Sequence, residues 1–180
     1  MLPATVALSG HDQHTRALFL GGRSGVGKST VAFALHDLLS SRSVTHAVVE
    51  GDALDLAYPS PWKHQMAEHN LRAIWANYTA NGYHRLIYTN TVSVLETDKL
   101  AQAIGGDPIV TSILLQASDE TTAERLERRE QGRSLDEHIE RSARSAGFLD
   151  AKSPASVLRV TTDGRTPVDI AEQLVSILGW

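Results

Sequence analysis

Short apolar runs alternate along the chain with longer segments in which apolar residues recur every three to four positions. The short runs predict strands, at Ala17–Leu20, Ala47–Glu50, His84–Tyr88, Ile109–Leu115 and Ser156–Thr161. The longer segments predict helices, at Lys28–Ser40, Trp62–Asn81, Thr97–Ile104, Ser118–Gln131, Leu135–Gly147 and Val168–Leu178. Regular alternation of strand and helix indicates a parallel sheet that is covered by helices on both faces.

The apolar positions also predict which side of each element is buried. On the first and last helices they share one face, and they are Val31, Ala34, Leu35, Leu38 and Leu39, and Ile170, Leu174, Val175 and Leu178. The run Ile109–Leu115 is apolar enough to predict a strand that is buried on both sides.

The segment Gly22–Thr30 joins the first predicted strand to the first predicted helix and reads GRSGVGKST. This is the phosphate-loop pattern G-x-x-x-x-G-K-[ST] in its strand–loop–helix context. The backbone N–H groups of such a loop hold phosphate oxygens, the lysine reaches the β- and γ-phosphates, and the Ser hydroxyl holds Mg²⁺. We therefore expect ATP, with GTP as an alternative, to be bound by Gly22, Arg23, Ser24, Gly25, Val26, Gly27, Lys28, Ser29 and Thr30.

Length and composition limit the kind of protein that carries this loop. A chain of 180 residues without an internal linker predicts a single domain, preceded by an N-terminal arm at residues 1–15. A net charge of −4 argues against general binding to nucleic acid or to an anionic membrane. The absence of cysteine excludes a disulfide framework, and the N-terminus does not resemble a secretory signal, so we expect a cytoplasmic protein.

The polar segments outside this loop indicate which class of phosphate-loop protein the sequence belongs to. The guanine-reading pattern N-K-x-D of signalling GTPases is missing, and the third and fourth predicted strands are not followed by the carboxylate of a transport or remodelling ATPase. A carboxylate instead follows the second strand, at Asp52. Because ligands gather at the carboxyl ends of parallel strands, Asp52 is expected to face the same crevice as the loop. There it could orient or deprotonate a substrate hydroxyl, or join Ser29 in holding Mg²⁺.

Arginines are dense in the segment RLERREQGR, residues 125–133. The transferring phosphoryl group spreads negative charge over its oxygens, and arginine meets such charge with two parallel hydrogen bonds. Arg125, Arg129 and Arg133 are therefore candidate catalytic residues, with Gly132 as a hinge. A solvated helix with ordinary ion pairs is the alternative interpretation of some of these arginines.

A further polar segment, TTDGRTP, lies between the last strand and the last helix. In a doubly wound sheet this connection lies beside the phosphate loop, and Arg165 could stack on the base of the nucleotide. An Asp-Gly turn followed by a proline that begins a helix explains the same residues structurally, and both interpretations can hold together.

Four segments in this order, GRSGVGKST, VVEGDAL, RLERREQGR and TTDGRTP, resemble the small P-loop kinases. That group contains adenylylsulfate, gluconate and shikimate kinases, chloramphenicol phosphotransferase and tunicamycin-resistance proteins. The resemblance implies a three-layer α/β/α P-loop NTPase fold with a five-stranded parallel sheet and a helical lid at about 125–147. It matches Asp52 to the aspartate after strand two, Lys28 and Ser29 to the ATP–Mg²⁺ residues, Arg125, Arg129 and Arg133 to the lid, and Arg165 to the adenine side. The Asp-Gly-Asp-Asn run of adenylylsulfate kinases reads EGDA here, which leaves the acceptor open.

The phosphate acceptor is expected between the second and third strands. Candidate residues there are Asp52, Tyr58, Trp62, Lys63, His64, Asn90 and Thr91, and their aromatic and hydroxyl groups suit a ring-bearing substrate. Trp62 and Trp75 could instead belong to the core. The sequence thus predicts a kinase that phosphorylates a hydroxyl of a metabolite, nucleoside-like compound or antibiotic. The alternatives are a nucleotide-binding protein that sequesters a small molecule, and an NTPase.

Overall fold

The computed structural model describes residues 14–128 and 133–180, and it contains a five-stranded parallel sheet in the order β2-β3-β1-β4-β5. The strands are β1 (Arg16–Gly21), β2 (Ala47–Glu50), β3 (Arg85–Thr89), β4 (Ile109–Gln116) and β5 (Leu158–Thr161). The predicted sheet is therefore confirmed. The chain leaves β1 toward β2 and β3 on one side and later adds β4 and β5 on the other. This makes the carboxyl end of β1 the switch point at which ligands bind in such sheets.

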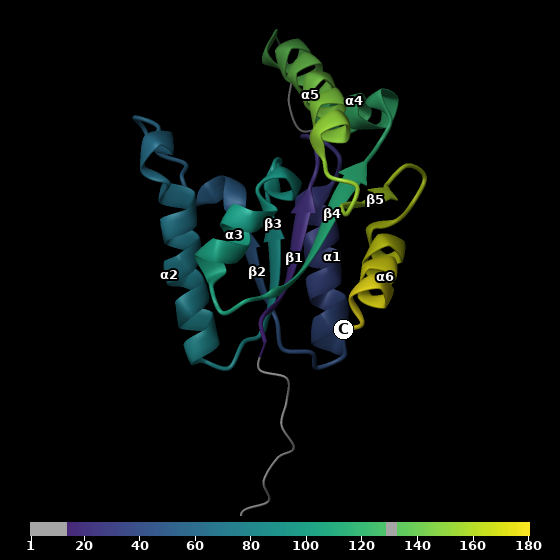
Figure 1. The fold of residues 1–180 in the computed structure, drawn as a ribbon. Coiled ribbons are helices and arrows are strands. Elements are labelled where there is room, and N and C mark those ends of the chain that lie inside the picture. Colours follow the sequence, from purple (N-terminus) through teal and green to yellow (C-terminus); the bar gives the residue numbers. More distant parts are fainter. Residues whose placement is uncertain (1–13, 129–132) are drawn as a thin grey trace, which may run out of the picture.

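Helices cover both faces of the sheet, which confirms the three-layer architecture (Figure 1). One face carries α1 (Lys28–Ser41) and α6 (Pro167–Leu178), and the other carries α2 (Met66–Ala80) and α3 (Thr97–Ile104). The helices α4 (Asp119–Glu127) and α5 (Arg133–Lys152) stand above the carboxyl ends of the strands (Figure 1).

The central strand β1 joins both halves of the core because its side chains alternate between the two faces. Leu18 and Leu20 pack with α1 and α6, whereas Ala17 and Phe19 pack with α2 and α3. The predicted apolar face of the last helix is buried in full, and that of the first helix is buried with Ala34 and Leu38 at its margin. Trp75 belongs to this core at 1% exposure.

Some element boundaries differ from the sequence prediction. Only Ile113–Leu115 of β4 is fully buried, and Ile109 is 48% exposed, because the strand begins at the rim of the sheet. The predicted helix at 62–81 divides into a short 3₁₀ turn, η2 (Trp62–His64), and α2, since Gln65 between them has a φ of 50°. The helix predicted at 135–147 is longer at both ends, as α5.

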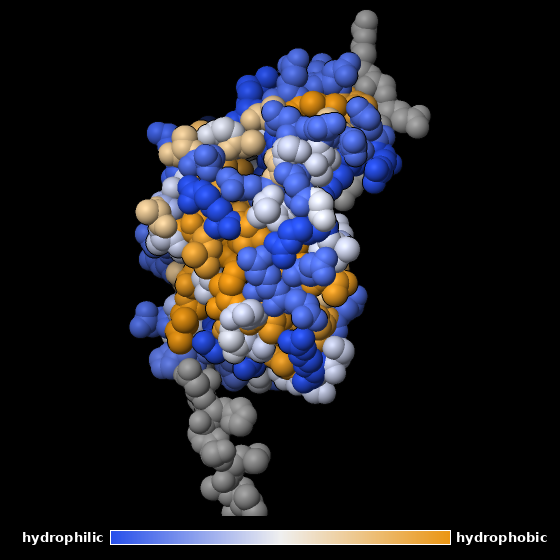
Figure 2. Space-filling model, turned by 90° about the vertical axis from the view of Figure 1, so that its right-hand side faces the viewer, coloured by the Kyte–Doolittle hydropathy of each residue, from blue (hydrophilic) through white to orange (hydrophobic). Residues whose placement is uncertain are grey.

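The surface on the α6 side is uneven in polarity (Figure 2). The part that rises above the sheet is largely hydrophilic, whereas apolar side chains reach the surface of the body below it. Exposed apolar residues of β5 and α6 include Leu158, Val168 and Ile177. Across residues 14–128 and 133–180, no helix has the length and apolar character needed to cross a membrane.

Candidate functional site

The phosphate loop runs from the end of β1 into α1 with a left-handed backbone at several glycines. The φ angles of Gly22, Gly25 and Gly27 are 145°, 81° and 103°, values that residues with a side chain rarely adopt. Gly25 also needs to lack a side chain, because a Cβ built there would lie 2.7 Å from Cγ2 of Thr122 in α4. Gly27 precedes α1 directly, so the positive end of that helix faces the loop. This is the geometry of an anion-binding loop.

The ammonium group of Lys28 lies over this loop. Its Nζ donates hydrogen bonds to the carbonyl oxygens of Gly22, at 2.8 Å, and Arg23, at 3.3 Å, and approaches Thr91 Oγ1 at 3.4 Å. The N–H of Gly22 donates to the Thr91 carbonyl at 3.2 Å. Thr91, which follows β3, is thus joined to the loop by two contacts, one through its hydroxyl and one through its carbonyl.

Asp52 lies on a single 3₁₀ turn, η1 (Gly51–Ala53), directly after β2. The amide of Asn90 donates a 2.8 Å hydrogen bond to Asp52 Oδ1. Oδ1 of Asn90 accepts a 2.9 Å hydrogen bond from the N–H of Val92, which fixes the direction of the amide. The carboxylate of Asp52 is therefore oriented from the end of the neighbouring strand.

Tyr88 supports the same turn from the end of β3. A Cβ built at Gly51 would lie 2.2 Å from the Tyr88 hydroxyl oxygen, so only glycine leaves room for this contact. Burial raises the pKa of Tyr88, and the charge of Asp52 raises it further. The phenol consequently stays neutral beside the carboxylate. Sequence reasoning assigned Tyr88 only to a strand, because an aromatic residue in an apolar run carries no further signal.

The loop and Asp52 face one cavity of about 180 Å³, which we call the Asp52 cavity. It is lined by Ser24, Gly25, Gly27, Lys28, Ser29, Asp52, Leu126 and His138. The structure thus brings together the lysine, the hydroxyl and the carboxylate that the sequence singled out. His138 of α5 did not stand out in the sequence, since it lies in a helix of mixed charge without a motif.

A neighbouring cavity of about 330 Å³, the Arg165 cavity, lies between the loop, α4 and the start of α6. Its lining residues are Val26, Gly27, Thr30, Val31, Arg125, Arg128, Thr162, Arg165, Pro167 and Ile170. The guanidinium of Arg165 donates to Gln173 Oε1 at 2.6 Å and to the Asp169 carbonyl at 3.2 Å. Gly27 lines both cavities, so both border the phosphate loop.

Arg125 is held on the side of the Arg165 cavity. Its Nη1 donates to the carbonyl of Val26 and to Thr162 Oγ1, each at 3.0 Å, and its Nη2 donates to the Thr162 carbonyl at 3.3 Å. Thr162 Oγ1 itself donates to the Val26 carbonyl at 3.1 Å. Arg125 and Thr162 therefore tie α4 and the β5–α6 connection to the loop. In the sequence Thr162 stands out only as part of the segment TTDGRTP, and nothing in its spacing indicates this contact.

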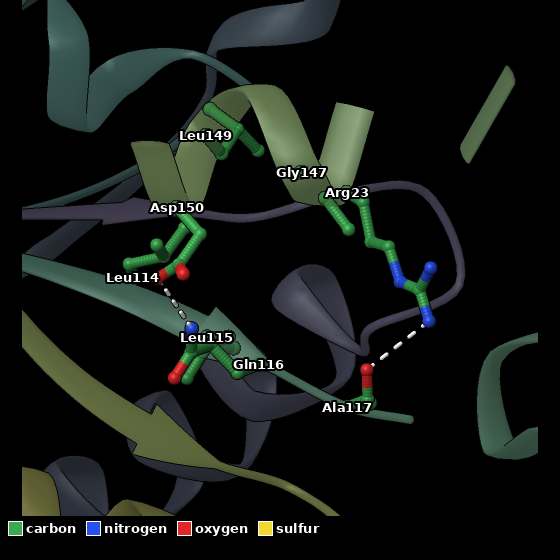
Figure 3. A pocket seen from close by; sticks show the side chains of 9 residues that line it. Arg23, Leu114, Leu115, Gln116, Ala117, Gly147, Leu149 and Asp150 are labelled. Carbon is green, nitrogen blue, oxygen red and sulfur yellow. Dashed lines mark hydrogen bonds between the residues drawn. The ribbon is translucent and has the colours of Figure 1, made fainter. Parts of the chain in front are cut away.

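The side chain of Arg23 leaves the loop and is buried at 3% exposure. It donates to the carbonyls of Ala117, at 3.1 Å, and Ser118, at 2.7 Å, and to Thr122 Oγ1 at 2.7 Å, and it pairs with the carboxylate of Asp119. Figure 3 shows this guanidinium turned toward Ala117, at one side of a cavity of about 250 Å³ beneath α5. The loop is thereby joined to the β4–α4 connection by a side chain that the motif leaves unspecified.

The other predicted acceptor residues belong to the segment between η1 and α2. Tyr58, Lys63 and His64 are exposed on the segment between η1 and α2, and within the described part of the chain none of them lines the Asp52 cavity. Trp62 begins η2.

The predicted lid is only partly described. Arg125 belongs to α4, and Arg133 is the first residue of α5. Arg129 and the predicted hinge Gly132 lie outside the described residues. The described residues contain no cluster of three or more His, Asp or Glu side chains that could hold a metal ion on its own.

No family model matches the sequence, and no curated protein matches it. Solved structures, however, share its fold. The tunicamycin resistance protein of Deinococcus radiodurans has a TM-score of 0.65 at 20% identity, covering 92% of this chain and 96% of that one. A gluconokinase from Sinorhizobium meliloti has a TM-score of 0.59 at 19% identity, covering 91% of each chain. The APS kinase CysC of Mycobacterium tuberculosis, solved with AMPPNP and APS, has a TM-score of 0.58 at 22% identity, covering 93% and 99%.

These similarities extend over almost the whole of each chain at low identity, so they establish the fold. The suspected resemblance is confirmed at that level: the chain has the three-layer α/β/α fold that these P-loop kinases and the tunicamycin resistance protein share.

Proposed function

We propose that this protein is an ATP-dependent phosphotransferase that moves the γ-phosphate of ATP to a hydroxyl group of a small molecule. The observation that carries the proposal is that Lys28, Ser29 and Asp52 line one cavity. A loop that holds phosphates beside an oriented carboxylate meets the needs of in-line phosphoryl transfer. The similarity to gluconokinase and to APS kinase with a bound ATP analogue supports the same function.

The phosphates of ATP would lie on the loop. The backbone N–H groups of Gly25 and Gly27 and the end of α1 supply donors, and Lys28 exchanges its carbonyl contacts for the β- and γ-phosphate oxygens. The ribose and base would extend into the Arg165 cavity, where Arg165 lies on the adenine side. GTP remains the alternative nucleotide.

Asp52 would act on the acceptor. The acceptor oxygen forms a bond to the γ-phosphorus while the bond from that phosphorus to the β–γ bridging oxygen breaks, and ADP leaves. The hydroxyl proton passes to Asp52, which Asn90 holds in a single orientation. Thr91, together with Tyr58, Trp62, Lys63 and His64, remains a proposed acceptor contact. We retain Arg125, Arg129 and Arg133 as proposed catalytic lid arginines.

The residues present suit Mg²⁺. The Ser29 hydroxyl and the Asp52 carboxylate line one cavity, and Mg²⁺ accepts one or two protein oxygens when phosphates and water complete its shell. When bound, Mg²⁺ would neutralise charge on the phosphate oxygens. Ser29 would bind it directly, and Asp52 directly or through water.

The decisive experiment measures ATP consumption in the presence of hydroxyl-bearing metabolites, nucleosides and antibiotics, tunicamycin included, followed by mass analysis for an added phosphate. For an acceptor found in this way, Asp52→Asn should lower kcat on the order of 10²- to 10⁴-fold, the usual contribution of a general base. Turnover that survives this change nearly intact would remove Asp52 from the reaction.

The alternative is a protein that binds nucleotide and sequesters a small molecule without transfer. The similarity to the tunicamycin resistance protein is the observation that favours it. It predicts that a compound binds tightly and is recovered unmodified after incubation with ATP. An NTPase acting on nucleic acid predicts binding that weakens steeply with salt, and the net charge of −4 argues against it.

A further inference from the structure

One face of α5 is fastened to the phosphate loop. The hydroxyl of Ser142 donates a 2.8 Å hydrogen bond to the carbonyl of Ser24, and Ser142 is 3% exposed. Leu149, two turns further along the same helix, is 1% exposed and packs with Leu114 of β4. The loop contact and the apolar contact together set both the height and the rotation of α5 over the sheet.

His138 lies on that same face. It precedes Ser142 by four residues, and residues four apart on a helix lie one above the other. Its side chain is half-buried and lines the Asp52 cavity together with Lys28, Ser29 and Asp52. The cavity is therefore lined by the phosphate loop, by Asp52 and by the imidazole of His138.

Two arginines of the α4 segment, Arg125 and Arg128, line the Arg165 cavity and not the Asp52 cavity. Arg125 is bonded to Val26 and Thr162, and Arg128 lies 3.8 Å from Glu124; both arginines line the Arg165 cavity. The cavity that contains Asp52 receives His138 and Leu126 from the helices above it. A γ-phosphate bound to Lys28 and Ser29 would thus face an imidazole.

We propose that His138 is a further catalytic residue, whose ring N–H donates a hydrogen bond to the transferring γ-phosphoryl group. The inference rests on the proposed function of the Asp52 cavity. A hydrogen-bond donor that is already in place stabilises the negative charge that spreads over the phosphate oxygens during transfer. Ser142 is the positioning residue, because its hydrogen bond to Ser24 holds α5 at the height at which His138 enters the cavity.

The kinetic test compares His138→Gln with His138→Arg, using the acceptor identified by the screen. His138→Gln should lower kcat on the order of 10- to 100-fold with little change in the KM for the acceptor, since the contact is made to the phosphoryl group in the transition state. His138→Arg keeps a hydrogen-bond donor at this position and should restore most of kcat. The control is His69→Gln, which removes an exposed imidazole from α2. Equal kcat values for wild type and His138→Gln would overturn the proposal.

A second test needs no acceptor and therefore separates this inference from the proposed function. The NMR signal of the His138 ring C–H is followed while the wild-type protein is titrated with AMPPNP and Mg²⁺, and separately with ADP and Mg²⁺. Contact with the γ-phosphoryl group predicts a shift with AMPPNP that ADP does not produce, and Ser142→Ala should reduce that shift while nucleotide still binds. Identical responses to both nucleotides, or none to either, would overturn the assignment even if the protein proves to be a kinase. If no acceptor is phosphorylated but the AMPPNP-specific shift appears, the transfer function fails and the contact stands.

Discussion

At the scale of single residues, the site depends on close contacts that a larger side chain would disrupt. Gly51 is the clearest case, since Tyr88 and the carbonyl of Thr89 occupy the space a side chain would need. Because Gly51 has no side chain, the turn that carries Asp52 can pack directly against β3. That contact places the carboxylate of Asp52 within reach of Asn90.

Gly51→Ala should consequently destabilise the protein and displace Asp52. Overpacking of a tight site typically costs about 1–3 kcal/mol, and we expect a loss of that order in urea unfolding. The matched control is Gly147→Ala in α5, because a Cβ at Gly147 meets nothing within 4 Å. There alanine should be neutral or stabilising, since it favours the helix. Similar losses for the two variants would show that the Tyr88 contact is not the cause.

At the scale of elements, the phosphate loop is held by several neighbours at once. Arg23 joins it to the β4–α4 connection, Ser142 joins it to α5, and Arg125 with Thr162 joins it to α4 and the β5–α6 connection. The loop of this protein is thus a point at which separate elements meet. Helix α4 acts as a wall of the site, because Thr122 packs closely on Gly25.

Arg23→Met tests this arrangement. Methionine keeps much of the volume but cannot donate the hydrogen bonds that Arg23 makes to the Ala117 carbonyl and to Thr122 Oγ1, and hydrogen bonds from a charged group contribute about 1.5–3 kcal/mol each. We expect reduced unfolding free energy and weaker ATP binding by calorimetry. Asp119→Asn is the control, because the Asp119 side chain is 80% exposed and its exposed charge should contribute less than about 1 kcal/mol. ATP affinity unchanged in Arg23→Met would contradict a role in shaping the loop.

A histidine pair joins α1 to the segment before β2. Nδ1 of His36 lies 2.9 Å from Nε2 of His46, whose Nδ1 lies 2.7 Å from the carbonyl of Val44. Burial lowers the pKa of His46 below its ordinary value of 6.5, against the opposing effect of the Val44 hydrogen bond, and the charges of His36 and Arg85 lower it further. The folded protein therefore disfavours the protonated form of His46.

The unfolding free energy should accordingly depend on pH through His46. Above pH 6.5 the imidazole is neutral in both states and contributes no slope. Below pH 6.5 the unfolded chain takes up the proton first, so stability falls as pH decreases toward the lower pKa of the folded state. His46→Gln should make the decline between pH 6.5 and 5 shallower in urea titrations, whereas His69→Gln should not. An unchanged slope in His46→Gln would contradict this prediction.

At the scale of the whole molecule, the fold places the loop, Asp52 and the two cavities at the carboxyl end of the parallel sheet. The central strand β1 carries the loop and is paired with β3 and β4 on either side. Because α4, α5 and the β5–α6 connection all contact the loop, ligand binding there involves most of the elements above the sheet. Nucleotide binding is therefore expected to stabilise the entire domain.

Thermal unfolding measures this directly. A ligand that binds only the folded state stabilises it by about 2.7 kcal/mol at a concentration of about 100 times its Kd. ATP with Mg²⁺ should raise the unfolding temperature of the wild-type protein, and Lys28→Ala should abolish most of the increase. Equal increases in both proteins would place the triphosphate outside the phosphate loop.

The amino-acid sequence by itself determined what is local. The spacing of apolar residues specified the five strands, most of the helices and the buried faces of α1 and α6, and a contiguous motif marked the phosphate loop with Lys28 and Ser29. Asp52 could be named because it directly follows a strand. Such features are legible because the residues involved lie within a few positions of one another.

The tertiary structure alone decided which distant residues meet. Asn90 and Asp52 were expected in one acceptor site, but only the fold shows that the Asn90 amide bonds to the Asp52 carboxylate. The fold also sends Arg23 to the β4–α4 connection and brings His138 into the Asp52 cavity. These pairs are separated by tens of residues, and their meeting depends on how strands are ordered and how helices cross above them. Periodicity and motif spacing encode neither, since both describe only neighbours along the chain. The loop could therefore be found in the sequence, whereas the side chains that complete the site became visible only in the fold.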